Sequence, residues 1–133
     1  MKSKHRLLYA GMKAVVIEDD SETRRLCRQV LEEHGLAVRE ANRGVAALAE
    51  LRKEPPHLIF VGLQLRDVSG FEAVGWIKSY PALSLVPVVA ISARGLPEDD
   101  PMLRQCGIQD VLRKPVSADA VARTICRLLG APP

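Results

Sequence analysis

Residues 57–70 read HLIFVGLQLRDVSG and combine the most apolar run of the chain with the loop that follows it. Leu58 to Val61 is too short for a helix core and is typical of a strand that is buried on both faces. In an open parallel α/β sheet, functional side chains lie just beyond the carboxyl ends of such strands. Gly62 stands at that end and has no side chain. The stretch therefore predicts a central strand whose expected reactive position is empty.

The composition indicates one domain. The chain has 133 residues, of which 47% are hydrophobic, enough for a sizeable core. Its net charge of +3 comes from Lys2, Lys4 and Arg6, so residues 7–133 are neutral overall. A neutral body argues against nucleic-acid binding, and no apolar run is long enough for a transmembrane helix or a signal peptide. We expect a cytoplasmic protein that binds neither nucleic acid nor membrane.

The three cysteines do not indicate a disulfide framework or a metal site. Cys27, Cys106 and Cys126 are odd in number, lack metal-ligand spacing and mostly stand among apolar neighbours. We expect reduced thiols in or near the core.

Strands and helices are predicted to alternate along the chain. Short apolar or β-branched runs read as strands, and a segment with helical spacing follows each of them. This alternation predicts an α/β fold with a doubly wound, five-stranded parallel sheet. In the second helix, Val45, Leu48 and Leu51 have the spacing of a buried face. The expected strands are 13–17, 36–41, 58–61, 86–92 and 110–113, and the expected helices are 21–34, 45–53, 70–80, 97–106 and 117–129.

Local signals mark the ends of the domain and of two helices. Residues 1–11 are polar and basic without periodicity and are expected to form an N-terminal tail. Residues 12–130 are expected to form the domain, and residues 131–133 a tail or linker. Asp20 and Ser117 stand where an N-cap is needed, because their side-chain oxygens can accept from free N–H groups of the first turn.

Motifs at four predicted strand ends resemble the receiver domain of two-component response regulators. They are Glu18-Asp19 after the first strand, RDVSG at 66–70 after the third, Ser92 after the fourth and Lys114-Pro115 after the fifth. The resemblance covers about residues 13–129 and implies a flavodoxin-like sheet with the strand order 2-1-3-4-5. It also implies a signalling protein that is not an enzyme. The implied partner is another protein, such as a sensor kinase or a regulator domain, or a second copy in a homodimer.

The acceptor position of that family is where this chain departs most. In receivers, a carboxylate at the end of the third strand takes up a phosphoryl group, Mg²⁺ neutralises the group, and Ser/Thr and Lys hold its oxygens. The motif places Gly62 at this position, and glycine has no nucleophile to offer. Arg66 and His57 are lesser departures, from the usual proline and the usual acidic residue. The resemblance thus implies a pseudo-receiver, which cannot be phosphorylated and acts through protein–protein interaction.

The resemblance also assigns the metal ligands. Asp19 would bind Mg²⁺ directly, Glu18 would bind it through water, and the backbone carbonyl of Gln64 would complete the protein ligands. Without an acid at Gly62, one direct carboxylate remains, so we expect the Mg²⁺ site to be weak or absent. We expect Asp19 to pair with Lys114 instead, because this ammonium group otherwise has no buried partner.

Two further positions bear on conformational switching. The family usually has Tyr or Phe at the position of Val111, and this ring moves inward when the hydroxyl, here that of Ser92, turns towards the phosphoryl group. Val111 is small and β-branched and cannot make that movement, so we expect a single dominant conformation. Alternatively, the Ser92 hydroxyl forms a hydrogen bond with a nearby backbone group and has only a structural role. The family also implies a cis peptide bond between Lys114 and Pro115.

The candidate interaction surface combines the last strand and the last helix. Arg113, Arg123 and Arg127 are the residues expected to form it. Trp76 is a second candidate, because it lies off the apolar stripe of its own helix.

Two alternatives remain open. The first is a phosphoryl-accepting receiver in which Gly62 is an engineered substitution or another acid is the acceptor. Asp67 and Asp20 are less suited to that role, because each is expected to cap a turn or a helix. The second is a small-ligand-binding flavodoxin-like module that uses the vacated space. The chain has no Gly-rich phosphate loop that would support it.

Overall fold

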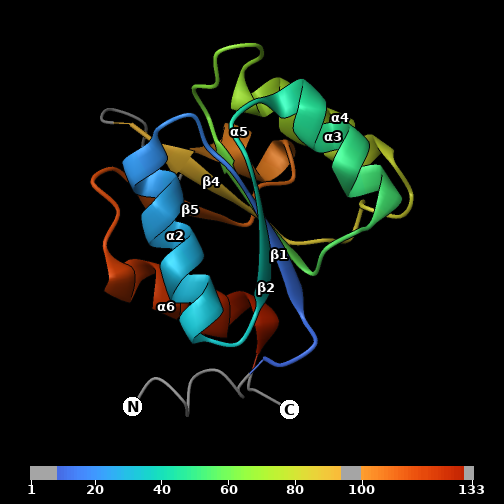
Figure 1. Ribbon diagram of the computed structural model, residues 1–133. Helices are drawn as coiled ribbons and strands as arrows, with labels where there is room; N and C mark the ends of the chain where they lie inside the picture. Colours follow the sequence, from blue (N-terminus) through green and yellow to red (C-terminus); the bar gives the residue numbers. More distant parts are fainter. Residues whose placement is uncertain (1–8, 94–99, 131–133) are drawn as a thin grey trace.

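Parallel strands lie side by side in the order β2-β1-β3-β4-β5 in the computed structural model, which describes residues 9–93 and 100–130. Within these residues there are five strands in one sheet, so the predicted fold class and strand order are confirmed (Figure 1). The strands are β1 (Lys13–Ile17), β2 (Ala37–Ala41), β3 (Leu58–Gly62), β4 (Val88–Ser92) and β5 (Asp110–Arg113). The helices are α2 (Ser21–Glu33), α3 (Gly44–Lys53), α4 (Gly70–Ser79), α5 (Pro101–Gln105) and α6 (Ala118–Leu129).

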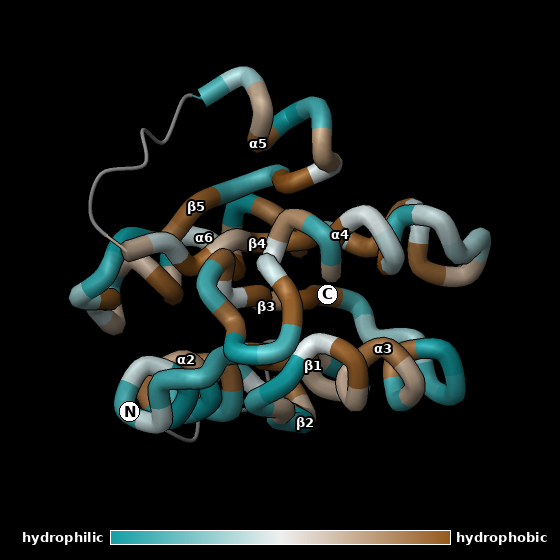
Figure 2. Tube along the Cα trace, turned by 90° about the horizontal axis from the view of Figure 1, so that it is seen from above, coloured by the Kyte–Doolittle hydropathy of each residue, from teal (hydrophilic) through white to brown (hydrophobic). Residues whose placement is uncertain are grey.

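The helices cover both faces of the sheet. Figure 2 shows α2 and α6 on one side of the strands and α3 and α4 on the other. Because side chains alternate along a strand, Ile59 and Val61 pack towards α3 and α4, whereas Leu58 and Phe60 pack towards α2 and α6. All four of these side chains are fully buried. The apolar run of β3 therefore supplies both halves of the core, as expected for a central parallel strand.

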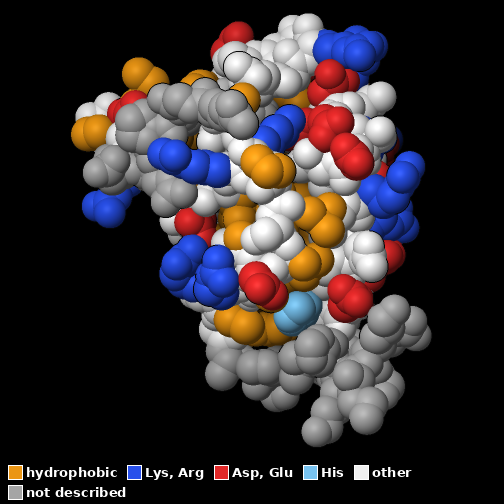
Figure 3. Space-filling model, turned by 90° about the vertical axis from the view of Figure 1, so that its left-hand side faces the viewer, with side chains coloured by type: hydrophobic (Ala, Val, Ile, Leu, Met, Phe, Trp, Pro, Cys, Tyr) orange, Lys and Arg blue, Asp and Glu red, His pale blue; other side chains and the backbone are white. Residues whose placement is uncertain are grey.

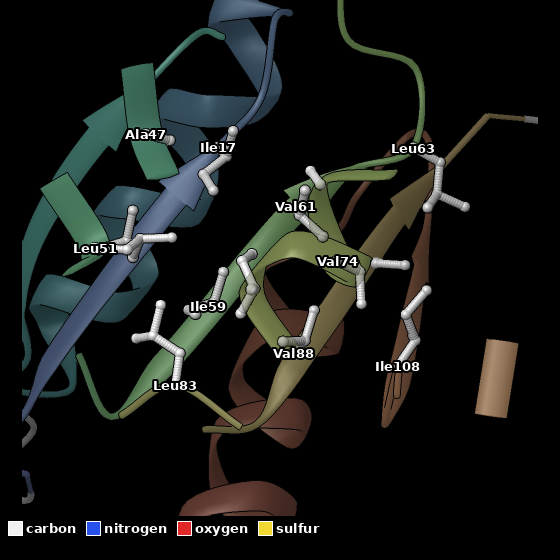
Figure 4. Close-up of a cluster of buried hydrophobic side chains, with 14 of the residues drawn as sticks. Ile17, Ala47, Leu51, Ile59, Val61, Leu63, Val74, Leu83, Val88 and Ile108 are labelled. Atoms are coloured by element: carbon white, nitrogen blue, oxygen red, sulfur yellow. The ribbon is translucent and has the colours of Figure 1, made fainter. Parts of the chain in front are cut away.

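The core beneath α3 shows one error in the prediction. Figure 4 shows the side chains of this core meeting between the strands and the helices, with Ala47 and Leu51 on α3. Gly44, Ala47 and Leu51 are buried at helical spacing. Val45 lies one position beyond Gly44, which turns its side chain away from the sheet, and it is 57% exposed. Val45 was therefore wrongly predicted to face the core, and Leu48 lies half-buried at its edge.

Some element boundaries differ from the prediction. The ladder of β4 begins at Val88 because the preceding Pro87 has no N–H group to donate. Within the described part of the helix expected at 97–106, α5 covers Pro101–Gln105. Residues 97–99 of that prediction lie outside the described residues.

The turn after β3 is built around Gly70. As predicted, α4 begins at this glycine, and Ser69 caps it by accepting from Glu72 N. A Cβ atom at Gly70 would lie 2.5 Å from Leu63 Cα and closer still to the carbonyl oxygen of Gly62. These are backbone atoms, so a side chain at this position would push α4 away from the end of β3. The missing side chain at Gly70 lets α4 pack directly on the strand end that carries Gly62.

The two ends of the described chain are joined. Tyr9 is fully buried, and its hydroxyl donates to the carbonyl oxygen of Gly130 at 2.9 Å. Burial raises the pKa of Tyr9 to about 12, with a contribution from Cys126. The packed body thus includes Tyr9, a residue from the segment expected as a tail. No helix in the described residues is long and apolar enough to cross a membrane.

The three cysteines lie in different surroundings. Cys27 is buried, and burial raises the pKa of its thiol to about 12. Cys106 is partly buried, whereas Cys126 is exposed. The expectation that all three lie in or near the core is wrong for Cys126, because it follows the buried Ile125 on α6 and so faces outward.

Candidate functional site

Three polar residues and a glycine at or just beyond the carboxyl ends of four strands lie at one edge of the sheet. Glu18 follows β1, Gly62 ends β3, Ser92 ends β4 and Lys114 follows β5. Parallel pairing of β1 with β3, β3 with β4 and β4 with β5 brings these ends to the same edge. We call Glu18, Asp19, Gly62, Ser92 and Lys114 the strand-end cluster. The sequence analysis named these residues, and the structure shows, as described next, that some of their contacts differ from those expected.

Glu18 is the buried acid of the strand-end cluster. Its side chain is 1% exposed, and its Oε2 accepts from Lys114 Nζ at 3.0 Å and from the backbone N–H of Asp20 at 2.8 Å. The ion pair therefore joins Glu18, not Asp19, to Lys114. The predicted Asp19–Lys114 pair is wrong because successive side chains at the end of a strand point in opposite directions.

Asp19 pairs with an arginine from another loop. Its Oδ2 accepts from Arg66 Nε at 3.0 Å, and the two side chains are 28% and 69% exposed, respectively. Sequence reasoning noted Arg66 only as a replacement for the usual proline and gave it no partner. The contact links the loop after β1 to the loop after β3.

The space beside Gly62 is filled by Glu18. A Cβ atom at Gly62 would lie 2.6 Å from Glu18 Oε1 and 3.2 Å from Glu18 Cδ. Real side-chain atoms do not come this close, so any side chain at Gly62 would require Glu18 to move. The carboxylate of Glu18 therefore stands where the side chain of an acceptor would begin.

Two buried polar atoms of the cluster lack partners. Glu18 Oε1 and Ser92 Oγ are buried and have no hydrogen-bond partner among residues 9–93 and 100–130. The Ser92 hydroxyl thus forms no hydrogen bond with backbone groups of the described residues. This finding does not support the structural role considered for it in the sequence analysis. Such atoms carry a desolvation cost, and among the described residues these two are the buried side-chain polar atoms that bear it.

The acids of the strand-end cluster are engaged by cations of the chain itself. Gly62 supplies no carboxylate, Glu18 is engaged by Lys114, and Asp19 is engaged by Arg66. The side chain of Gln64 is exposed, and its backbone forms an isolated bridge with Ser69. Across the described residues, no three His, Cys, Asp or Glu side chains are grouped so that they could hold a metal. Mg²⁺ prefers near-octahedral oxygen ligands, and both carboxylates of the cluster are paired with cations of the chain.

Arg24 holds the acidic loop of the strand-end cluster in place, and the sequence analysis did not predict this role. Its Nη1 donates to the backbone carbonyls of Glu18 at 2.7 Å and Asp19 at 3.3 Å, and its Nε pairs with Glu40 at 2.9 Å. Helical side chains tilt towards the N-terminus of their helix, so an arginine in the first turn of α2 reaches the loop before it. The place of Arg24 in the first turn of α2 was therefore the sequence feature that could have predicted its contact with this loop. Arg24 anchors the acidic loop to the end of β2.

The two remaining acids near the cluster act as caps. Asp20 accepts from Thr23 N and Thr23 Oγ1, and the latter bond is the main cause that lowers the pKa of Asp20. Asp67 accepts from Val45 N and Gly44 N, both at 3.0 Å, and these bonds lower its pKa. The N-cap role of Asp20 is confirmed. Asp67 lies in another loop but caps α3. The residue at the N-cap position of α3 makes no side-chain hydrogen bond of its own.

The position expected to switch lies on β5. Val111 is half-buried and packs against the hydrophobic cluster under α3 and α4. At the end of β5, the Lys114–Pro115 peptide bond is cis, as the resemblance implied. No ring stands at Val111 that could move when Ser92 turns.

A hollow of about 630 Å³ opens beside the cluster, between the first turn of α2 and the loop that joins β5 to α6. Leu26 and Val116 contribute apolar surface, and Thr23 and Lys114 contribute polar surface. Figure 3 shows the face that carries α2 and α6, where hydrophobic side chains gather between charged ones. Lys114 is thus the solvent-facing member of its ion pair, and Glu18 is the enclosed one.

The arginines predicted as an interaction surface lie around one hollow of about 350 Å³ between β5 and α6. We call Arg113, Arg123 and Arg127 the arginine surface; all three are exposed. Arg127 also pairs with Asp110 at the start of β5. Trp76 is half-buried on α4, across the sheet from α6, so it does not belong to this surface.

Comparison with protein families agrees with this geometry. The model of the response regulator receiver domain matches residues 14–125. The chain belongs to this family. Relatives of this receiver domain include the polar-differentiation response regulators DivK of Brucella anthropi and Brucella melitensis. Each is 32% identical over 116 residues, which cover 87% of this chain and 94% of the relative. The chain is therefore a receiver domain of two-component signal transduction.

Solved structures share the fold of this receiver domain. The chemotaxis response regulator CheY4 of Vibrio cholerae has a TM-score of 0.82 at 22% identity, covering 90% of this chain and 98% of its own. The receiver domain of the sensor histidine kinase PA1611 from Pseudomonas aeruginosa, solved with a magnesium ion in its active-site cleft, has a TM-score of 0.80 at 24% identity over 92% and 100%. The receiver domain of Ssk1 from Saccharomyces cerevisiae, crystallised with the histidine phosphotransfer protein Ypd1, has a TM-score of 0.77 at 25% identity over 90% of each chain.

Proposed function

We propose that this receiver domain is a pseudo-receiver, which accepts no phosphoryl group and signals by binding another protein. The observation that carries the proposal is the exchange at Gly62, where the acceptor side chain is missing and Glu18 fills the space beside it. An acceptor must be an ionised nucleophile that a phosphodonor can reach. Glu18 is 1% exposed and paired with Lys114, so it does not meet the second requirement.

The proposal includes weak or absent Mg²⁺ binding. Arg66 and Lys114 engage the carboxylates of Asp19 and Glu18, which would otherwise be available to a metal. Mg²⁺ gives up its waters reluctantly, and it gains little from a site that offers no free carboxylate. Phosphoryl transfer would then lack both the acceptor and the ion that neutralises the transferred group.

The partner in this proposal is a signalling protein, such as a sensor kinase or a regulator domain, or a second copy in a homodimer. The co-crystal of the Ssk1 receiver with Ypd1 shows that a receiver of this fold can bind such a protein. The arginine surface supports a partner with acidic groups, since guanidinium groups bind carboxylates in a planar, two-pronged geometry. Because Val111 stands where other receivers have a ring that moves, we propose that this binding is constitutive. We also propose that it involves no enzymatic step.

Intact-mass spectrometry tests the proposal. The natural protein is incubated with acetyl phosphate or a phosphoramidate and Mg²⁺, beside the Gly62→Asp variant. We expect no added mass in the natural protein and one phosphoryl group on a fraction of the variant. A stoichiometric phosphoryl group on the natural protein would contradict the pseudo-receiver function.

One observation favours a second candidate function, that of a receiver with another acceptor. Glu18 Oε1 has no partner among the described residues and faces the vacant position at Gly62. If Glu18 were the acceptor, the natural protein would gain a phosphoryl group and the Glu18→Gln variant would not. Peptide mapping of the phosphorylated protein would then identify the modified residue.

The small-ligand alternative gains nothing from the structure at Gly62. The volume left by the missing side chain is occupied by the carboxylate of Glu18. A ligand would have to displace that carboxylate from Lys114 before it could use the space.

A further inference from the structure

Arg66 reaches from the loop after β3 to the loop after β1. Its Nε donates to Asp19 Oδ2 at 3.0 Å, so the guanidinium group neutralises the carboxylate that would bind a metal directly. The Glu18–Lys114 pair lies deeper, since Glu18 is 1% and Lys114 is 29% exposed. The outer pair is therefore the one that an ion arriving from solvent meets first.

The two ion pairs balance the charge of the strand-end cluster. Glu18 and Asp19 carry two negative charges, and Lys114 and Arg66 carry two positive charges. A receiver with an acid at the position of Gly62 and no arginine at the position of Arg66 would instead have three acids against one lysine. The excess of negative charge in such a cluster favours a divalent cation. This chain neutralises its cluster with its own side chains.

We propose that Arg66 is the residue that excludes Mg²⁺ from this receiver domain, because its guanidinium group takes the place of the cation at Asp19. This inference rests on the proposed pseudo-receiver function and names the residue that makes the domain independent of metal. The loss of the acceptor at Gly62 removes one ligand. Arg66 removes a second ligand by occupying Asp19.

Both ends of the Arg66–Asp19 pair are anchored. Asp67, the neighbour of Arg66, is fixed by its bonds to Gly44 N and Val45 N at the start of α3. The backbone carbonyl of Asp19 is held by Arg24 at 3.3 Å. The anchored loops keep the two backbones at a fixed separation, so the pair forms without the loss of loop entropy that would add to its side-chain entropy cost. The contact is thus better placed to persist than an ordinary surface pair.

The test measures Mg²⁺ affinity by isothermal titration calorimetry in variants that carry Gly62→Asp, in which we expect binding to be strong enough to measure. We compare Gly62→Asp with Gly62→Asp/Arg66→Ala. The matched control is Gly62→Asp/Arg104→Ala, which removes an exposed arginine from α5. We expect the Arg66 double variant to bind Mg²⁺ about two- to fivefold more tightly than Gly62→Asp, the range set by an exposed ion pair. Gly62→Asp/Arg66→Lys keeps the charge and should fall back towards Gly62→Asp.

Equal affinities in the Arg66→Ala and Arg104→Ala double variants would overturn the inference, because the effect would then be one of net charge alone. Absence of Mg²⁺ binding in all of these variants would overturn it as well, since Arg66 would not be what keeps the metal out. Arg66 is exposed, so its replacement leaves the core intact, and thermal melts check this directly.

The natural chain supplies a second readout. Mn²⁺ broadens the amide resonances of nuclei near its binding site, and we expect stronger broadening at Asp19 and Asp20 in Arg66→Ala than in the natural protein. Identical broadening would contradict the inference. Intact masses of the same samples after acetyl phosphate treatment separate the two proposals. A phosphorylated natural protein refutes the pseudo-receiver function, whereas an unphosphorylated protein with unchanged metal affinity in Arg66→Ala refutes only the role of Arg66.

Discussion

Glu18 and Ser92 of the strand-end cluster are as buried as the side chains in the middle of the sheet, yet their polar atoms are not satisfied in the same way. Phe60 and Val89 are fully buried among hydrophobic neighbours, where many small contacts add up. Glu18 and Ser92 are 1% exposed, and each carries an oxygen with no hydrogen-bond partner among the described residues. The core of the sheet therefore depends on a pattern shared by many residues. The cluster depends on single atoms, so one substitution can change its chemistry without changing the fold.

The largest expected effect lies in the middle of the sheet. Phe60→Ala removes a fully buried ring from the core under α2 and α6, and we expect it to lower the free energy of unfolding by about 3–5 kcal/mol. Urea denaturation followed by circular dichroism measures this change. Leu85→Ala is the control, because Leu85 is 92% exposed and its removal should change stability by less than about 0.5 kcal/mol. Similar losses for both variants would contradict the assignment of the core.

The next effect tests the inner ion pair of the cluster. Lys114→Met leaves the carboxylate of Glu18 buried without its cation, and we expect a loss of about 2 kcal/mol in the free energy of unfolding. The loss is below that for a fully buried pair because 29% of the Lys114 side chain is exposed. The measurement is the same denaturant titration.

The double variant Glu18→Gln/Lys114→Met sharpens the comparison. Removing both charges removes the unpaired carboxylate, so most of the stability lost in Lys114→Met should return. Recovery would show that the loss came from the carboxylate. If the double variant is as unstable as the single one, Lys114 stabilises the domain by packing rather than by charge.

A smaller effect concerns the loop that joins the cluster to α3. Asp67→Ala removes the side chain that accepts from Val45 N and Gly44 N, and we expect a loss of about 1 kcal/mol, typical of a lost helix cap. These bonds lower the pKa of Asp67, so its contribution is complete above the usual pKa of an aspartate. The contribution is lost as the pH falls through the lowered pKa of the folded state. Thermal melts of both proteins from neutral to acidic pH should therefore converge below about pH 4. A constant difference across this range would contradict the cap.

The sequence predicted the fold more completely than the contacts of the cluster. Apolar runs and helical spacing alternate repeatedly along the chain, so the doubly wound α/β class followed from a pattern that does not depend on any single residue. The strand order was implied by the resemblance to receiver domains. The partner of Asp19 depended on which way one side chain leaves the end of β1, and neighbouring positions there point in opposite directions. Arg66 lies far from Asp19 in the sequence, and no local pattern links the two. Val45 was misplaced for a related reason, because a shift of one position turns a helical side chain away from the core.

The most direct test of metal independence compares thermal melts of the natural protein and the Gly62→Asp variant with and without millimolar Mg²⁺. An aspartate at Gly62 displaces Glu18 and crowds three carboxylates together, so we expect the variant to lose about 1 kcal/mol or more of its free energy of unfolding without metal. Mg²⁺ should restore part of that loss by binding the folded state, whereas the natural protein should melt at the same temperature with or without the ion. Sodium chloride at matched ionic strength serves as the control. If the natural protein gains as much stability from Mg²⁺ as the variant does, its own side chains have not replaced the metal.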